Sequence, residues 1–271
     1  MTDTSSYPEC DDLAVTVSDD GVVVRVVIDR PEKQNALSET VLSGLSDVLR
    51  AADQGPARVV VIRGAGGTFC SGGDLESMAS HIGGGPQAYR SGFSGLAELM
   101  EQLIETSALV VAAVEGHCLA GGMGLAAACD IIIATADATF GTPEVDIGLF
   151  PAQALVPIMR TVQEKQALKL LFTGEYIGAE TAHEIGFTSE VVPTQDFESE
   201  LDELIKDLAA SSPVMIEMGK QAFYTQRDMD FHEALSYMRE IIALIAMSEE
   251  TEAGINSFLM NEQPDWKQRG Q

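Results

Sequence analysis

The sequence predicts an α/β protein with a helical C-terminal region. Over the first two thirds of the chain, short β-branched runs alternate with amphipathic segments, as in an α/β core. From Ala154 onward, apolar residues recur mainly at helical spacing. The chain has 271 residues, 45% of them apolar, which is enough for a sizeable core. We therefore expect a core domain over residues 1–195 and a helical region over residues 196–271.

A hairpin and three further strands build the predicted sheet. Residues 13–18 and 22–28 are β-branched runs joined by Asp19-Asp20-Gly21, a sequence typical of a tight turn between antiparallel strands. Later short apolar runs have the length and composition of buried strands. They span residues 59–62, 109–114 and 131–134.

Helices are expected between and after these strands. Ser38 can cap a helix whose apolar positions follow helical spacing. A second helix is expected around residues 96–106, after a loop at residues 83–86. In the C-terminal region, residues 194–211 and 231–247 carry apolar stripes. The wide stripe of the last segment fits either the core or a contact between copies of the chain.

The net charge of −26 limits the classes of partner. Sixteen Lys and Arg residues oppose 42 Asp and Glu residues, whereas nucleic acids and anionic membrane surfaces attract basic patches. We therefore expect neither a nucleic acid nor a membrane as partner. The acids are spread along the chain, as on a solvated surface, and a high-salt cytoplasm would screen their mutual repulsion.

Other sequence features favour a cytoplasmic location. No run is long enough for a transmembrane helix, and the N-terminal residues MTDTSSYPECDD lack the apolar segment of a secretory signal. The histidines show no ligand spacing, so no metal site is expected. The cysteines form no C-x-x-C pair or zinc pattern, and we expect free thiols in a reducing compartment. They are Cys10, Cys70, Cys118 and Cys129.

Residues 122–127 read G-x-G-x-x-A, a weak fingerprint of dinucleotide binding. A crossover to a parallel strand needs about a dozen residues. Here only residues 125–130 separate Gly124 from the strand that begins at Ile131. The acid at the fingerprint distance, Glu144, lies beyond the end of that strand rather than at it. We therefore do not expect nucleotide redox chemistry.

Two glycine-rich turns, each between a buried strand and a helix, indicate a different chemistry. They span residues 69–76 and 116–124. The start of a helix leaves backbone N–H groups unpaired, and the helix dipole favours negative charge there. Two such turns that face each other can donate to one oxygen and form an oxyanion hole. Glycine suits these turns because a substrate must approach the main chain closely.

A series of short motifs surrounds these turns. They are Arg30-Pro31 with Asn35-Ala36-Leu37, Phe69-Cys70-Ser71-Gly72-Gly73-Asp74-Leu75, Ala120-Gly121-Gly122 with Ala128-Cys129-Asp130, and Phe140-Gly141-Thr142-Pro143-Glu144 with Gly148. With these motifs the chain resembles the enoyl-CoA hydratase/isomerase (crotonase) family over nearly its full length. The resemblance implies a spiral of ββα units with a helical C-terminal region used in trimer formation, usually with two trimers stacked. It also implies a coenzyme A thioester as substrate and no further cofactor.

The resemblance implies roles for individual residues. The N–H groups of Gly73 and Gly121 would hold the thioester oxygen. Polarisation of the thioester acidifies the adjacent carbon, and Glu144 would move protons there as general acid and base. We expect burial to raise the pKa of Glu144, and we favour a helix-capping role for Asp74. The residues implied at the acyl-CoA site are Lys33, Ala36, Leu37, Ser71, Gly72, Gly73, Asp74, Leu75, Gly121, Pro143 and Gly148.

The chain departs from the efficient hydratases of this family at Gly124, where they carry a second glutamate. A single acid favours a double-bond shift in an enoyl-CoA, in fatty-acid or related acyl-CoA metabolism. Hydration or dehydration of a CoA thioester is the alternative enzymatic activity, and a non-catalytic acyl-CoA binder is the alternative of another class.

Two further positions near Glu144 bear on the proton chemistry. Asp146 would share the side of Glu144 if the segment were extended, although we favour a surface role for it. Ala152 stands where dienoyl isomerases of the family have a carboxylate, which argues against that activity. We expect residues 150–153, Phe-Pro-Ala-Gln, to shape the end of the pocket where the acyl chain lies.

The charge predicts that salt stabilises the protein. At molar ionic strength the Debye length falls to about 3 Å, so repulsion among the acidic side chains is screened. Calorimetry across a KCl series should show a melting temperature that rises by several degrees. A sucrose series of matched osmolality separates screening from general preferential exclusion. A higher melting temperature in dilute buffer than in molar KCl would contradict the surface-charge interpretation.

Overall fold

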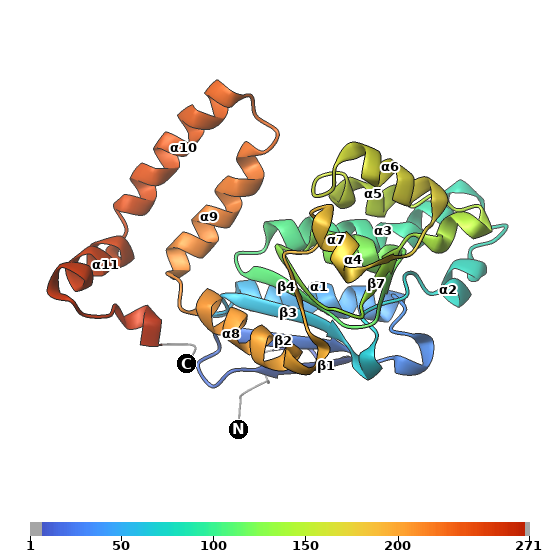
Figure 1. Cartoon of the computed structure of the whole chain (residues 1–271), viewed down its shortest axis with the longest axis horizontal. Coiled ribbons are helices and arrows are strands. Elements are labelled where there is room, and N and C mark those ends of the chain that lie inside the picture. The colour runs from blue at the N-terminus through green and yellow to red at the C-terminus, as the bar shows by residue number, and fades with distance from the viewer. Residues whose placement is uncertain (1–6, 269–271) are drawn as a thin grey trace.

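Two β-sheets form the core of the computed structural model, which describes residues 7–268 (Figure 1). The larger sheet has six strands in the order β1 (Leu13–Val17), β2 (Val23–Ile28), β3 (Val59–Gly64), β4 (Leu109–Val114), β6 (Ile131–Thr135) and β9 (Glu190–Val192). The smaller sheet comprises β5 (His117–Leu119), β7 (Thr139–Gly141) and β8 (Ile177–Gly178). Residues 1–6, on which the expectation about a secretory signal partly depends, and residues 269–271 lie outside the described residues.

The larger sheet contains the predicted hairpin and buried strands. β1 and β2 are antiparallel, with Leu13 opposite Ile28. The intervening turn includes Gly21 at a φ of 73°, a conformation that favours glycine. β2, β3, β4, β6 and β9 then pair in parallel. Parallel strands are covered on both faces, which explains the nearly continuous apolar runs in the sequence.

Helices connect and cover the strands. Their bounds are α1 Glu39–Asp53, α2 Leu75–Ser80, α3 Gly85–Glu105, α4 Gly121–Ala128, α5 Ala152–Ile158, α6 Glu164–Thr173, α7 Ala179–Glu184, α8 Phe197–Ala209, α9 Pro213–Gln226, α10 Phe231–Ala246 and α11 Glu249–Met260. Ser38 caps α1 as predicted, because its side-chain oxygen accepts from the Val41 N–H. α3 begins at Gly85, earlier than predicted, because Pro86 occupies its first turn, where a missing N–H costs no hydrogen bond.

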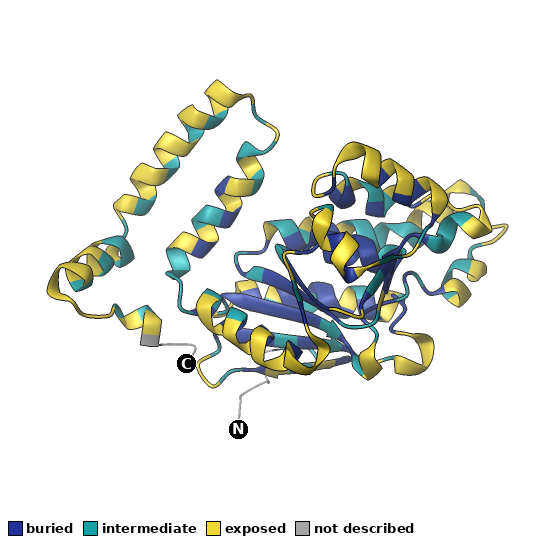
Figure 2. Cartoon of the chain, viewed as in Figure 1, coloured by how far each residue is buried: buried dark blue, intermediate teal, exposed yellow. Residues whose placement is uncertain are grey.

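Apolar residues cover both faces of the larger sheet, and Figure 2 shows that buried residues concentrate in the strands and in α4. Side chains of α1, α3 and α4 pack in one cluster. On the other face, Phe197, Leu201 and Ile205 of α8 pack against strand residues such as Val59 and Ile133. The helical region therefore begins on the core itself. The division at residue 195 stays a prediction.

A buried ion pair joins α9 to the core. Lys220 Nζ donates to Asp130 Oδ2 at 2.7 Å and to the carbonyl oxygens of Leu103 and Ala108 at 2.8 Å. The Tyr224 hydroxyl donates to the other carboxylate oxygen of Asp130 at 2.9 Å. Burial lowers the pKa of Lys220, and the charge of Asp130 opposes that shift. This network anchors α9 at the core surface.

Beyond α9, the chain extends away from the core as α10 and α11 (Figure 1). Most residues of these helices are coloured as exposed in Figure 2. The exposed residues include the large apolar Phe231, Ile242, Leu244 and Phe258. The expected role of this region in trimer formation stays a prediction. Within residues 7–268, no helix is long and apolar enough to cross a membrane, and no group of three or more His, Cys, Asp and Glu residues could hold a metal ion. All four cysteines are free thiols.

We expect Lys220→Met to destabilise the fold strongly. The substitution leaves the Asp130 carboxylate buried without its charged partner, and removal of one partner of such a pair costs about 3–5 kcal/mol. Urea unfolding followed by circular dichroism measures this cost. Lys165→Met, at an exposed lysine, is the matched control and should change the free energy of unfolding little. Equal stability of the two variants would contradict the anchoring role of Lys220.

Candidate active site

The two glycine-rich turns predicted from the sequence lie side by side. The backbones of Cys70 and Cys118 pair as an isolated parallel β-bridge, while their thiols stay free. The Cys70 N–H donates to the His117 carbonyl oxygen at 3.0 Å, and the Leu119 N–H donates to the Cys70 carbonyl oxygen at 2.8 Å. After this pairing both segments continue into helices, the first into α2 and the second into α4. A short strand-like contact therefore brings the two turns together.

The backbone amides of Gly73 and Gly121 are neighbours at this point. A Cβ atom built on Gly121 would lie 3.6 Å from the Gly73 nitrogen, and one built on Gly72 would lie 3.2 Å from the Gly121 nitrogen. Within residues 7–268, neither N–H group donates a hydrogen bond to another protein atom. Two unused donors from separate turns therefore border the same cavity.

Each of the two turns contains a residue with a positive φ angle. Gly72 has a φ of 108° and Ala120 a φ of 50°, and the latter is rare for a residue with a Cβ atom. The Ala120 N–H donates to the Gly141 carbonyl oxygen at 2.8 Å, which holds the second turn against the smaller sheet. Such conformations persist where the surrounding contacts over-determine them.

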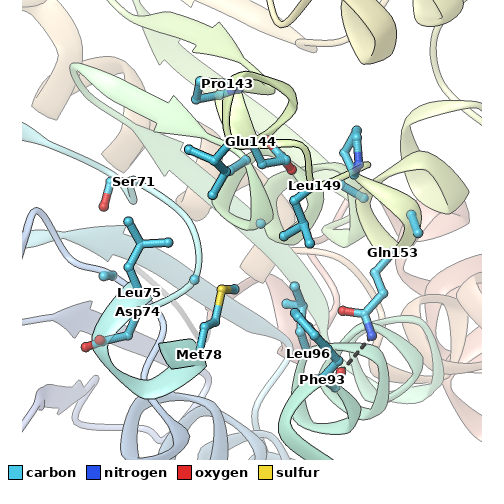
Figure 3. A pocket seen from close by; sticks show the side chains of 18 of the residues that line it. Ser71, Asp74, Leu75, Met78, Phe93, Leu96, Pro143, Glu144, Leu149 and Gln153 are labelled. Carbon is cyan, nitrogen blue, oxygen red and sulfur yellow. Dashed lines mark hydrogen bonds between the residues drawn. The ribbon is translucent and has the colours of Figure 1, made fainter. Parts of the chain in front are cut away.

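A cavity of about 770 Å³ opens beside the two amides (Figure 3). This volume and its mostly apolar walls are typical of a site for a small organic ligand. Most of the residues expected at the acyl-CoA site line it, namely Lys33, Ala36, Ser71, Gly73, Asp74, Leu75, Gly121, Pro143 and Glu144.

Leu37, Gly72 and Gly148, which were expected at the same site, lie outside the cavity lining. Leu37 is buried because it pairs with the first turn. Its N–H donates to the Gly72 carbonyl oxygen at 2.8 Å, and its carbonyl oxygen accepts from the Asp74 N–H at 3.1 Å. Gly148 ends the short 3-10 helix Pro143–Ile147 at a φ of 79°. These three residues shape the backbone behind the cavity.

Asp74 has the structural role expected of it. Its carboxylate accepts from the N–H groups of Glu76 and Ser77 and thereby caps α2. Arg30 Nη2 donates to its other oxygen at 3.0 Å. Burial opposes ionisation of Asp74, but these donors outweigh it and keep the pKa of Asp74 below its ordinary value.

Among residues 7–268, Glu144 is the one carboxylate of the cavity lining without a charged partner. Asp74 pairs with Arg30, and Glu76 pairs with Lys33 at 2.9 Å. Glu144 is half-buried beside Pro143, and within the described residues its buried Oε2 atom has no hydrogen-bond partner (Figure 3). Burial raises the pKa of Glu144 above its ordinary value, as expected. Because burial favours its neutral form, such a carboxyl group is suited to take up a proton and return it.

Asp146 lies apart from Glu144. The segment Pro143–Ile147 is a 3-10 helix with about three residues per turn, so side chains two positions apart point in different directions. Asp146 is exposed and does not line the cavity. This geometry agrees with the surface role that we favoured, and not with the extended segment in which it would share the side of Glu144.

Gly124 is the point where α4 packs against α5. A Cβ atom there would lie 2.8 Å from Ala154 Cβ, 2.9 Å from Ala154 Cα and 2.7 Å from Met100 Cε. The first two distances involve main-chain or rigid atoms, so any side chain at residue 124 would displace α5. The space for a second glutamate is therefore already filled.

Part of the apolar wall was not predicted from the sequence. Met78 of α2, Phe93 and Leu96 of α3, and Ile147 and Leu149 near Glu144 line the cavity. In a sequence these residues look like core positions, and α2 and the start of α3 lie in a stretch with weak helix signals. The segment 150–153 lines the cavity, as expected.

Comparison with known proteins identifies the family. The sequence model described as enoyl-CoA hydratase/isomerase matches residues 19–269. The chain belongs to the enoyl-CoA hydratase/isomerase family. The resemblance noted in the sequence is thereby confirmed, and the fold is crotonase-like.

Several members of the enoyl-CoA hydratase/isomerase family are similar to this chain over most of its length. The mitochondrial enoyl-CoA hydratase domain-containing protein 3 of Xenopus laevis is 31% identical, over 97% of this chain and 88% of its own. The 2,3-dehydroadipyl-CoA hydratase of Escherichia coli K12 is 30% identical, over 91% and 96%. The crystal structure of human enoyl Coenzyme A hydratase domain-containing protein 3 has a TM-score of 0.89 at 31% identity, covering 94% of this chain and all of that one.

We expect Gly124→Ala to destabilise this family member. Alanine normally favours a helix over glycine by about 1 kcal/mol, but overpacking against α5 costs about 1–3 kcal/mol. Urea unfolding should therefore show a net loss, and Gly124→Glu should lose more. Gly219→Ala, inside α9, is the matched control and should not destabilise the protein, because an added Cβ there meets only the Met215 Sδ atom at 4.0 Å. A stabilised Gly124→Ala would contradict the packing described.

Proposed function

We propose that the protein is an acyl-CoA enzyme that isomerises the double bond of an enoyl-CoA. In this proposal the N–H groups of Gly73 and Gly121 hold the thioester oxygen, and Glu144 moves the proton. The observation that carries the proposal is an unpaired, half-buried carboxyl group on the same cavity as two unused backbone donors.

The chemistry requires no other reactant. Glu144 takes the proton from the carbon next to the thioester carbonyl of a 3-enoyl-CoA. The electron pair moves onto the thioester oxygen, where the two N–H groups stabilise the negative charge. Loss of one such donor typically costs about 10²–10³ in kcat. The negative charge then moves from the thioester oxygen back into the acyl chain, and Glu144 delivers the same proton two carbons beyond the carbon that lost it. The double bond has moved without gain or loss of water.

The inventory of acids supports isomerisation over hydration. Asp74 and Glu76 are engaged by cations, and α5 fills the space at Gly124, so Glu144 would have to act alone. One carboxyl group can shuttle one proton, whereas family hydratases hold a water between two. Hydration or dehydration is the alternative, favoured by the printed name of the E. coli hydratase relative.

A non-catalytic acyl-CoA binder is the alternative from another class. Burial of a carboxyl group without a partner opposes its ionisation and costs free energy. Binding of the thioester alone does not require such a group. Exchange of the proton next to the carbonyl of a bound saturated acyl-CoA with heavy water discriminates the two, because a binder catalyses none.

We also propose the wider setting of this activity. The exposed apolar side chains of α10 and α11 would be covered in a homotrimer or a dimer of trimers. A cytoplasmic location is proposed from the acidic composition, whereas the Xenopus relative carries a mitochondrial name. The acyl chain would be metabolised in fatty-acid or related acyl-CoA pathways.

Glu144→Gln should retain acyl-CoA binding and lose activity by about 10²-fold or more, because only proton transfer is removed. Calorimetric titration with a saturated acyl-CoA measures binding. Absorbance and mass spectrometry of 2-enoyl-CoA and 3-enoyl-CoA incubations separate bond migration from uptake of water. Asp146→Asn is the matched control and should act like the wild type. Unchanged turnover of Glu144→Gln would refute the role of Glu144.

The pH dependence should report the raised pKa of Glu144. Glu144 must be ionised to take the first proton, so kcat/KM should fall on the acidic side with a midpoint above the ordinary value of 4.5. The folded protein holds this proton more tightly than the unfolded chain. Its stabilising effect is therefore present at low pH and lost as pH rises through the folded pKa. Steady-state rates across pH measure the midpoint, and a midpoint at 4.5 or below would contradict the effect of burial.

A further inference from the structure

Gln153 places an amide group in an otherwise apolar part of the cavity. It lies in the first turn of α5 and lines the cavity near Phe93, Leu96 and Leu149. Its Nε2 atom donates to the Phe93 carbonyl oxygen of α3 at 2.6 Å, across the gap between the two helices. Nothing in the proposed proton transfer uses this residue.

The hydrogen bond to Phe93 fixes the orientation of the amide. A carbonyl oxygen only accepts, so the NH2 group of Gln153 must face Phe93 and its Oε1 atom must face elsewhere. In Figure 3 this oxygen lies on the side of the amide nearer Leu96 and Leu149. Within residues 7–268, Oε1 accepts no hydrogen bond. The cavity wall therefore presents a fixed acceptor that has no partner in the described part of the chain.

Gln153 lies far from the first glycine-rich turn. Figure 3 shows Ser71 and Leu75 at one side of the cavity and Gln153 at the other, with Glu144 between them in this view. On the proposed function, the thioester lies at Gly73 and Gly121. An acyl chain that passes Glu144 toward α5 would then end beside Gln153.

An acceptor in this place discriminates among acyl chains. An alkyl chain would cover the Oε1 atom and leave it without a donor, at a cost in binding. A chain that ends in a carboxylate would bring a second acceptor, because the NH2 group is already engaged with Phe93. A hydroxyl group donates and satisfies the oxygen. Sites built to bond a substrate hydroxyl reject analogues that lack it much more strongly than apolar pockets distinguish one methylene.

We propose that Gln153 selects acyl-CoA substrates with a hydrogen-bond donor, such as a hydroxyl group, on the acyl chain. This inference rests on the proposed function only for the position of the thioester. It names the class of substrate that the same site takes.

Binding of unreactive ligands tests the inference apart from the chemistry. The ligands are thioether analogues of acyl-CoA. They come in pairs of equal chain length, one ending in a methyl group and the other in a hydroxyl group. Calorimetric titration into the whole chain measures their binding. At the length that reaches α5, the wild type should bind the hydroxyl analogue about tenfold or more tightly than the methyl analogue. Gln153→Met should abolish or invert this preference, because methionine fills similar space without the acceptor. Gln163→Met, at an exposed glutamine outside the cavity, should leave it unchanged.

The outcomes separate this inference from its neighbours. Equal binding of both analogues by the wild type at every length would overturn it. So would a Gln153→Met variant that melts lower but keeps the preference, since Gln153 would then only hold α5 to α3. A clear preference in binding without any turnover of enoyl-CoA esters would leave the inference standing and refute the proposed function. Failure of both analogues to bind would overturn the two together.

Discussion

The parallel β-bridge between the backbones of Cys70 and Cys118 is the contact on which the candidate site depends. It pairs Cys70, which lies outside the named strands, with Cys118 in β5 of the smaller sheet. The donors of Gly73 and Gly121 are left unpaired because each sits just after this bridge, where its chain turns into a helix. Their proximity is therefore a consequence of backbone pairing and does not depend on flexible side chains.

The packing of α4 on α5 decides how many acids can reach the reacting carbons. The close approach of the two helices at Gly124 and Ala154 closes the place of a second carboxylate. The same approach brings Gln153, one residue before Ala154, to the cavity and to the carbonyl oxygen of Phe93. A single packing choice thus limits the proton chemistry and shapes the wall that an acyl chain would meet.

Charge pairing distinguishes Glu144 in a chain that carries a net charge of −26. Asp74 and Glu76 also line the cavity, yet each lies against a cation, Arg30 or Lys33. Glu144 comes from a short 3-10 helix on the other wall, where apolar neighbours replace cations and raise its pKa. Although the chain has many acidic residues, the absence of a neighbouring cation distinguishes Glu144 from the other acids that line the cavity.

The sequence by itself predicted the hairpin, the strands β3, β4 and β6, the helices α1, α3, α8 and α10, and a helix after each glycine-rich turn, because periodicity and turn signals are local properties of the chain. The candidate residues Gly73, Gly121 and Glu144 came from motifs that resemble those of the family. The strands β5, β7, β8 and β9 were not predicted, because two or three residues are too few to show a period. The sequence placed the start of α3 too late, since glycines and a proline there mimic a loop. Only the tertiary structure decided that Leu37 lies outside the cavity lining, that α5 fills the space at Gly124, and that Glu144 has no charged partner within residues 7–268. These facts depend on contacts between segments distant along the chain, and no local pattern encodes which side chain occupies a shared space.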